Sequence, residues 1–146
     1  MPEVQVDLTI DAEVDEVWSM VRGVEAYPNY MTNVRSVDIL ADHGDTRVTA
    51  WSVFLKGSIL EWSESERIDD SVRRIEFSQL DGDLERFVGY WQVTADESGA
   101  TRVVLDIDFE IGIPLLAQML DPVAGRALRD NSEQMLRSLE RKAIAG

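Results

Sequence analysis

Hydrophobic and polar residues alternate along much of the chain, most clearly over Thr101–Glu110. Four apolar residues share one side of that segment: Val103, Leu105, Ile107 and Phe109. Four charged residues share the other side, where Val104 is the exception: Arg102, Asp106, Asp108 and Glu110. A period of two predicts a β-strand with one buried face and one face in water. We therefore expect the acidic side of this strand to be solvated.

Six further segments have the length and residue types of strands: Val4–Ile10, Val34–Leu40, Arg47–Lys56, Ser58–Ile68, Val72–Leu80 and Glu85–Thr94. Glycine and aspartate residues, which tolerate the backbone angles of tight turns, separate most of them. Strands at this regular spacing predict an antiparallel meander.

Helical spacing of apolar residues appears near both ends of the chain. Glu13–Arg22 is expected to form a helix capped by Asp11, followed by a shorter element over Tyr27–Met31. A longer amphipathic helix is expected over Arg126–Lys142, where Glu133 and Arg137 form a favourable pair one turn apart.

Two prolines lie in the segment before the long helix. Pro114 is expected to open a preceding helical segment, and Pro122 with Gly125 to break or kink it. The order of elements is then one strand, two short helices, six strands and a long helix. We predict an α+β fold in which a seven-stranded curved antiparallel sheet surrounds the C-terminal helix, with residues 1–146 as one domain.

Composition and charge narrow the classes of function. With 14 basic and 28 acidic residues the net charge is −14, which disfavours nucleic acid and anionic membrane surfaces. No apolar run approaches the length of a membrane span, and the first residues lack the pattern of a signal peptide. We therefore expect a cytoplasmic protein without membrane association.

Cysteine is absent and His43 is the single histidine. These counts exclude disulfides, thiolate metal sites, a cysteine nucleophile and multi-histidine metal centres. His43 lies in an Asp/Gly-rich turn, so we expect it on the surface and outside any catalytic site. The neighbouring carboxylates lack the spacing of a calcium loop, so we expect no metal.

Two stretches resemble the START / Bet v 1-like (SRPBCC) superfamily. Val14–Leu40, reading VDEVWSMVRGVEAYPNYMTNVRSVDIL, resembles its opening: a tryptophan-bearing helix, Tyr-Pro and a strand. Phe77–Val93, reading FSQLDGDLERFVGYWQV, is similar to the polyketide cyclase/dehydrase and coenzyme-Q-binding branches. The resemblance implies a helix-grip fold enclosing a cavity for a hydrophobic small molecule.

The resemblance also implies catalytic residues. Aromatase/cyclases of this superfamily carry a W-x-W-x-S-x-R pattern that faces the cavity. Here Ser65 and Arg67 keep its end, whereas Glu61 and Ser63 replace the two tryptophans. Arg67 would polarise carbonyls and stabilise enolate oxygens, Ser65 would donate a hydrogen bond, and Glu61 would transfer protons.

Candidate ligand-binding residues follow from the same resemblance and from the apolar faces: Trp91, Ser63, Tyr30, Val34, Phe87, Asn131 and Met135. Val34 stands where those cyclases have a tyrosine, and Trp91 and Asn131 match cavity residues. Trp18, Trp51 and Trp62 fit either a site for a flat ligand or an ordinary core.

The strand Ser58–Ile68 can be read in two ways. Its periodicity places Leu60 and Trp62 inside and the odd-numbered residues outside, whereas the resemblance places the odd-numbered residues in the cavity. The two are mutually exclusive, because a shift of one residue turns every side chain to the other face.

Three functions remain open from the sequence. The first is cofactor-independent cyclisation or dehydration of a polyketide-like molecule, and the second is non-enzymatic carriage of a quinone, lipid or polyketide product. The third is a regulatory or toxin-antitoxin-type module that binds a protein partner. We expect no cofactor. A homodimer is also left open.

Overall fold

Seven strands form one antiparallel sheet in the order β1-β7-β6-β5-β4-β3-β2. Their bounds are β1 (Glu3–Ile10), β2 (Val34–Asp42), β3 (Thr46–Leu55), β4 (Ser58–Asp69), β5 (Arg74–Gly82), β6 (Arg86–Ala95) and β7 (Thr101–Glu110). This computed structural model describes residues 3–55, 58–110 and 114–145. From β2 to β7, strands that are neighbours in the sequence are also neighbours in the sheet, so the predicted meander is confirmed. The first strand, β1, pairs with β7 at the edge of the sheet.

Two short helices follow β1, as predicted. They are α1 (Val14–Arg22) and α2 (Tyr27–Tyr30), with a 3-10 turn over Val24–Ala26 between them. The expected cap by Asp11 is wrong: Glu13 holds the N-cap position, and its side chain makes no capping bond. Because Val17 and Val21 are completely buried, packing of the apolar face holds α1 in place.

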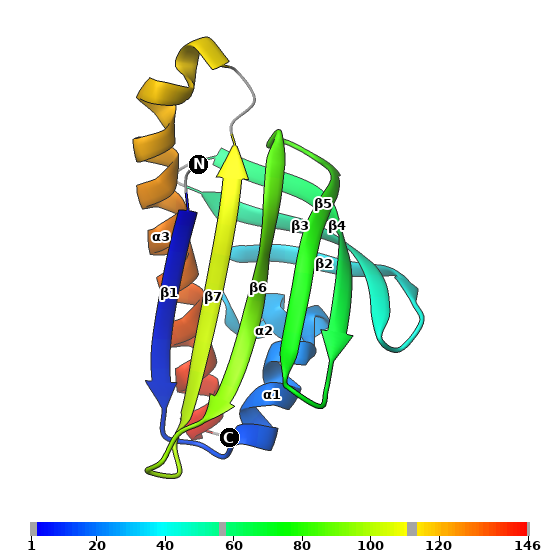
Figure 1. Ribbon diagram of the computed structural model, residues 1–146, viewed down its shortest axis with the longest axis vertical. Coiled ribbons are helices and arrows are strands. Elements are labelled where there is room, and N and C mark those ends of the chain that lie inside the picture. The colour runs from blue at the N-terminus through cyan, green and yellow to red at the C-terminus, as the bar shows by residue number, and fades with distance from the viewer. Residues whose placement is uncertain (1–2, 56–57, 111–113, 146) are drawn as a thin grey trace.

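The C-terminal helix α3 runs from Pro114 to Ala145 as one element. It continues through Pro122 and Gly125, so of the two outcomes expected there, a break or a kink, the break is wrong. Figure 1 shows the first turns of α3, in gold, set at an angle to the rest. A proline inside a helix removes one hydrogen bond and kinks the axis, which the neighbouring turns can tolerate.

The sheet curls so that β2 and β3 cross behind β6 and β7, while α3 runs beside β1 and α1 and α2 lie towards one end (Figure 1). This is the predicted helix-grip arrangement, in which the inner face of the sheet and one side of α3 enclose the core. Among the residues that the structure describes, no helix has the length and apolar character needed to cross a bilayer.

The acidic side of β7 differs from the expectation. Asp106 is only 6% exposed, because β7 lies between β1 and β6 and neighbouring side chains cover its outer face. Gln5 on β1 donates a hydrogen bond to the Asp106 carboxyl at 3.0 Å. Burial, together with the negative charge of Glu3, raises the pKa of Asp106.

Candidate functional site

A cavity lies between the inner face of the sheet and α3. Its lining is mostly aromatic and aliphatic: Trp51, Val53, Leu60, Trp62, Glu64, Phe77, Phe87, Trp91, Leu105, Ile107, Leu128, Asn131, Ser132 and Met135. The hollow between the lining atoms, mouth included, is about 470 Å³, but the space open to the centre of a water molecule is about 40 Å³. A ligand larger than a few waters must therefore displace side chains.

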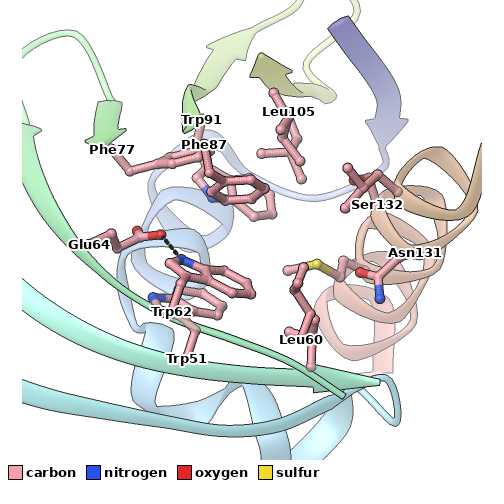
Figure 2. Close-up of a pocket in the computed structure, with 14 residues that line it drawn as sticks. Trp51, Leu60, Trp62, Glu64, Phe77, Phe87, Trp91, Leu105, Asn131 and Ser132 are labelled. Atoms are coloured by element: carbon pink, nitrogen blue, oxygen red, sulfur yellow. Dashed lines mark hydrogen bonds between the residues drawn. The ribbon is translucent and has the colours of Figure 1, made fainter. Parts of the chain in front are cut away.

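Stacked tryptophans form one wall of the cavity. Trp51 and Trp62 are cross-strand partners on β3 and β4, and their rings stack almost parallel at 5.7 Å. Phe87 tilts against Trp62 at 4.9 Å, and Tyr27 meets Trp91 edge-on at 6.0 Å. Figure 2 shows Trp51 and Trp62 on one side of the hollow and Phe87 and Trp91 on the other. Such a space suits a flat apolar molecule.

Glu64 is the ionisable residue in this lining. It follows Trp62 on the inner face of β4, is 3% exposed, and accepts a hydrogen bond from the Trp62 indole Nε1 at 2.7 Å (Figure 2). Burial raises the pKa of Glu64 well above its ordinary value, and a hydrogen bond with Glu66 and that residue's charge add to the effect. The carboxyl is therefore held in its neutral form inside the cavity.

A buried polar ladder continues from Glu64 along the two strands. Arg47 Nε donates to Glu66, its cross-strand partner, and the Thr49 hydroxyl donates to the other Glu66 oxygen at 3.0 Å. Trp51 donates its indole N–H to Thr49 at 2.8 Å. Glu66 is thus paired with a cation, whereas burial, followed by the hydrogen bond with Glu66, raises the pKa of Glu64. A carboxyl with a raised pKa can give a proton to a bound molecule and take one back.

The opposite wall of the cavity comes from α3. The Asn131 side chain donates a hydrogen bond from Nδ2 to the Phe54 carbonyl oxygen at 2.9 Å. The main-chain carbonyl oxygen of Asn131 accepts a hydrogen bond from Asn33 Nδ2 at 3.0 Å. Ser132 and Met135 lie beside it in the lining. These bonds hold α3 against β3 and against the turn before β2.

The structure brings some of the expected ligand-binding residues together and separates others. Four lie in the lining: Trp91, Phe87, Asn131 and Met135. Three lie elsewhere: Ser63, Tyr30 and Val34. Val34 is buried at the start of β2, and the Tyr30 ring packs edge-on against Tyr27. The Tyr30 hydroxyl is buried and has no hydrogen-bond partner among the described residues.

The expected cavity positions of Glu61, Ser65 and Arg67 are wrong. All three are exposed on the outer face of β4, and Ser63 lies on that face with them. Alternate residues of a strand point to opposite faces, so the burial of Trp62 and Glu64 turns the odd-numbered residues outward. Glu61 instead pairs with Arg35 on the surface at 3.7 Å.

Glu64 and Glu66 were missed from the sequence. The signal was present, because a period of two carried on from Leu60 and Trp62 reaches both glutamates and then Ile68. The Glu61–Arg67 pattern of the resemblance drew attention to the opposite face.

His43 is exposed in the hairpin between β2 and β3, away from the cavity. In the described parts of the chain, no group of three or more histidine, aspartate or glutamate side chains is arranged to hold a metal ion. The polar ladder is thus the acid–base group nearest to the aromatic lining.

Comparisons with known proteins agree with this architecture. The family model described as polyketide cyclase / dehydrase and lipid transport matches residues 10–136. Among curated proteins, no sequence matches the chain. A solved structure from Thermus thermophilus is 29% identical, covers 99% of this chain and 98% of its own, and superposes with a TM-score of 0.91.

Two more distant structures share the fold. The Zhui aromatase/cyclase from a Streptomyces species is 22% identical with a TM-score of 0.84, over 97% of this chain and 93% of its own. A START superfamily protein from Mycobacterium smegmatis is 20% identical with a TM-score of 0.82, over 99% of both chains. The chain therefore belongs to the polyketide cyclase/dehydrase and lipid transport family.

Proposed function

We propose that the cavity binds a flat hydrophobic molecule, aromatic or polyketide-like, and promotes its cyclisation and dehydration without a cofactor. One observation carries the proposal: the buried carboxyl of Glu64, whose pKa is raised, lies in the aromatic lining of the cavity. The family to which the chain belongs, and its likeness to an aromatase/cyclase fold, support this class of reaction.

The Glu64 carboxyl supplies both proton transfers of a dehydration. One of its oxygens gives the acid proton to the hydroxyl, and the other takes a proton from the neighbouring carbon, which lies next to a carbonyl. A carbon–carbon double bond forms, water leaves, and Glu64 again holds one proton. The aromatic walls hold the chain in a folded pose, which lowers the entropy cost of ring closure.

Carriage of a quinone, lipid or polyketide product is the second candidate function. It is favoured by the outward orientation of Glu61, Ser65 and Arg67, which leaves few polar groups in the lining. Under this alternative the Glu64 carboxyl would orient the ligand and perform no chemistry.

Tryptophan fluorescence tests binding directly, because three of the four tryptophans line the cavity. The chain is titrated with an anthraquinone-like polycycle, a ubiquinone analogue and a fatty acid. Saturable quenching by the polycycle supports the first candidate, and saturation by the quinone or fatty acid alone supports the carrier. No response to any of the three contradicts both.

Substitution then separates catalysis from carriage. In a cyclisation assay with a linear poly-β-ketone, Glu64→Gln should abolish turnover while the polycycle still binds. Glu61→Gln is the matched control, because it makes the same chemical change on the outer face of the same strand. Arg67→Ala should also leave turnover unchanged. Full turnover in Glu64→Gln would remove the Glu64 carboxyl from the mechanism.

A further inference from the structure

Two carboxyls and one guanidinium are buried side by side at the polar end of the cavity. Arg47, Glu64 and Glu66 are each less than 5% exposed, and Arg47 and Thr49 are bonded to Glu66. One carboxyl is therefore left without a cation. Burial and the adjacent Glu66 raise the pKa of that carboxyl, Glu64, well above its ordinary value, which favours a proton in this place when no ligand is bound.

Few charged groups face this pair. Arg47 reaches it from β3, and the Tyr27 hydroxyl on α2 is neutral because burial raises its pKa. The residues that α3 contributes to the lining carry no charge: Leu128, Asn131, Ser132 and Met135. Among the described residues, Arg47 is thus the one cation in the network around Glu64.

The bonding capacity of Glu64 indicates which ligand group fits. Its Oε1 accepts a hydrogen bond from the Trp62 indole, and a further hydrogen bond joins its carboxyl to Glu66. The oxygens of this carboxyl can still accept further hydrogen bonds. A ligand group placed against it therefore needs to donate hydrogen bonds.

The lining beside Glu64 also suits a positive charge. Trp51, Trp62 and Phe87 surround the approach to the carboxyl, and the faces of indole and phenyl rings attract organic cations. The net charge of −14 further raises the concentration of cations around the protein. An anionic ligand such as a fatty acid would meet two carboxyls instead.

We propose that the cavity takes an organic cation: a flat hydrophobic molecule with a protonated amine that pairs with the Glu64 carboxyl. This inference rests on the ligand binding in the proposed function and falls under carriage, because a Glu64 that has lost its proton has none to give in a dehydration. On binding, the ligand keeps its own proton, Glu64 loses its proton to the solvent, and two carboxylates then face two cations.

Isothermal titration calorimetry with three probes of one size tests the proposal: 2-(aminomethyl)naphthalene, 2-naphthalenemethanol and 2-naphthoate. The amine should bind ~10-fold tighter than the alcohol at pH 8, a ratio that needs only about 1.4 kcal/mol. Its affinity should rise as the pH is raised from 6 to 8, because the proton on Glu64 becomes easier to remove. Titrations in buffers of different ionisation enthalpy should show proton release with the amine and none with the alcohol.

Glu64→Gln should remove both the preference for the amine and the proton release, while the alcohol still binds. Gln keeps an acceptor for Trp62 and a donor for Glu66, so the ladder remains bonded. Glu61→Gln should behave as wild type. If Glu64→Gln does not fold, the proton release and pH dependence of the wild-type protein still decide the question.

Three outcomes would overturn the inference. Equal affinity for amine and alcohol, or amine binding without proton release, would leave ligand binding intact and remove the charge preference. Tighter binding of the naphthoate than of the amine would show that the cavity prefers an anion. Absence of binding by all three probes would contradict the proposed function together with the inference.

Discussion

Arg47 on β3 and Glu66 on β4 are cross-strand partners, and they are 4% and 2% exposed. The guanidinium Nε donates to the carboxylate, and Thr49 satisfies the second carboxylate oxygen at 3.0 Å. Removing two charges from water is costly, so the pair is tolerated only while both partners remain. Beside this pair, burial is the largest cause of the raised pKa of Glu64, and the adjacent Glu66 adds to it.

Arg47→Met should destabilise the protein by about 3–5 kcal/mol, because it leaves the buried Glu66 without its cation. The double variant Arg47→Met/Glu66→Gln should recover much of that loss, since no unpaired charge remains. Urea unfolding followed by circular dichroism measures both. Arg35→Met is the control, because Arg35 pairs with Glu61 at the exposed surface and should change stability by less than about 1 kcal/mol. A double variant no more stable than the single would contradict the argument.

The stability of the protein should depend on the protonation of Glu64. Its pKa in the folded protein lies well above the ordinary value of 4.5. Between those two values the folded chain holds a proton that the unfolded chain has lost. Stability should therefore fall as pH rises from about 4.5 towards the raised pKa.

The comparison with Glu64→Gln isolates this dependence, since Asp106 and other carboxyls titrate in both proteins. The difference in unfolding free energy, wild type minus variant, should decline steadily from pH 5 to pH 8 in urea titrations. A difference that stays constant over this range would show that Glu64 is ionised in the folded protein.

Much of the fold was predictable because each hairpin is encoded locally. Alternation along Thr101–Glu110 and turn residues between strands indicated the meander without any long-range information. The orientation of β4 was harder, because both of its faces carry polar residues. Glu64 and Glu66 look like solvent-facing residues until Arg47 and Thr49 are brought against them.

The same limit explains the other differences. Asp106 lies on the polar side of an alternating strand, and its burial depends on Gln5, which is 101 residues away in the sequence. The continuation of α3 through Pro122 departs from the local rule that a proline ends a helix. The aromatic part of the site was partly predictable, since Trp91 and Phe87 share a face of one strand, whereas the polar ladder is a product of tertiary contacts.

Gly89 makes room for the aromatic wall of the cavity. It lies on the inner face of β6, and a Cβ at this position would collide with the Asp106 carbonyl oxygen and the Phe77 ring. Gly89→Ala should therefore destabilise the protein by about 1–3 kcal/mol, as overpacking does in other cores. Thermal unfolding measures the change.

Gly125→Ala provides the contrast within the same molecule. A Cβ there meets the Phe109 ring at 3.8 Å, an ordinary contact, and the position is helical. Alanine should leave stability unchanged or raise it by up to about 1 kcal/mol. Equal losses in both variants would show that steric crowding at Gly89 is not the cause.

Ligand entry should depend on the bonds between α3 and its neighbours. The open space in the cavity is only about 40 Å³, so the lining must move apart before a polycycle can enter. Asn131 is bonded to the Phe54 carbonyl and to Asn33, and these bonds resist such movement. Asn33→Ala removes one of them without changing the lining, because Asn33 does not lie in it.

Asn33→Ala should therefore speed both association and dissociation of an anthraquinone-like polycycle, with little change in affinity, in stopped-flow tryptophan fluorescence. Its stability should fall by about 1 kcal/mol, the usual cost of a lost hydrogen bond. Asn131→Ala should speed entry in the same way. Because Asn131 lies in the lining, any difference in affinity between this variant and Asn33→Ala measures the contact of Asn131 with the ligand. Unchanged rates in both variants would mean that the cavity opens elsewhere, and movement of β5 and β6 away from Trp62 would then be the alternative route.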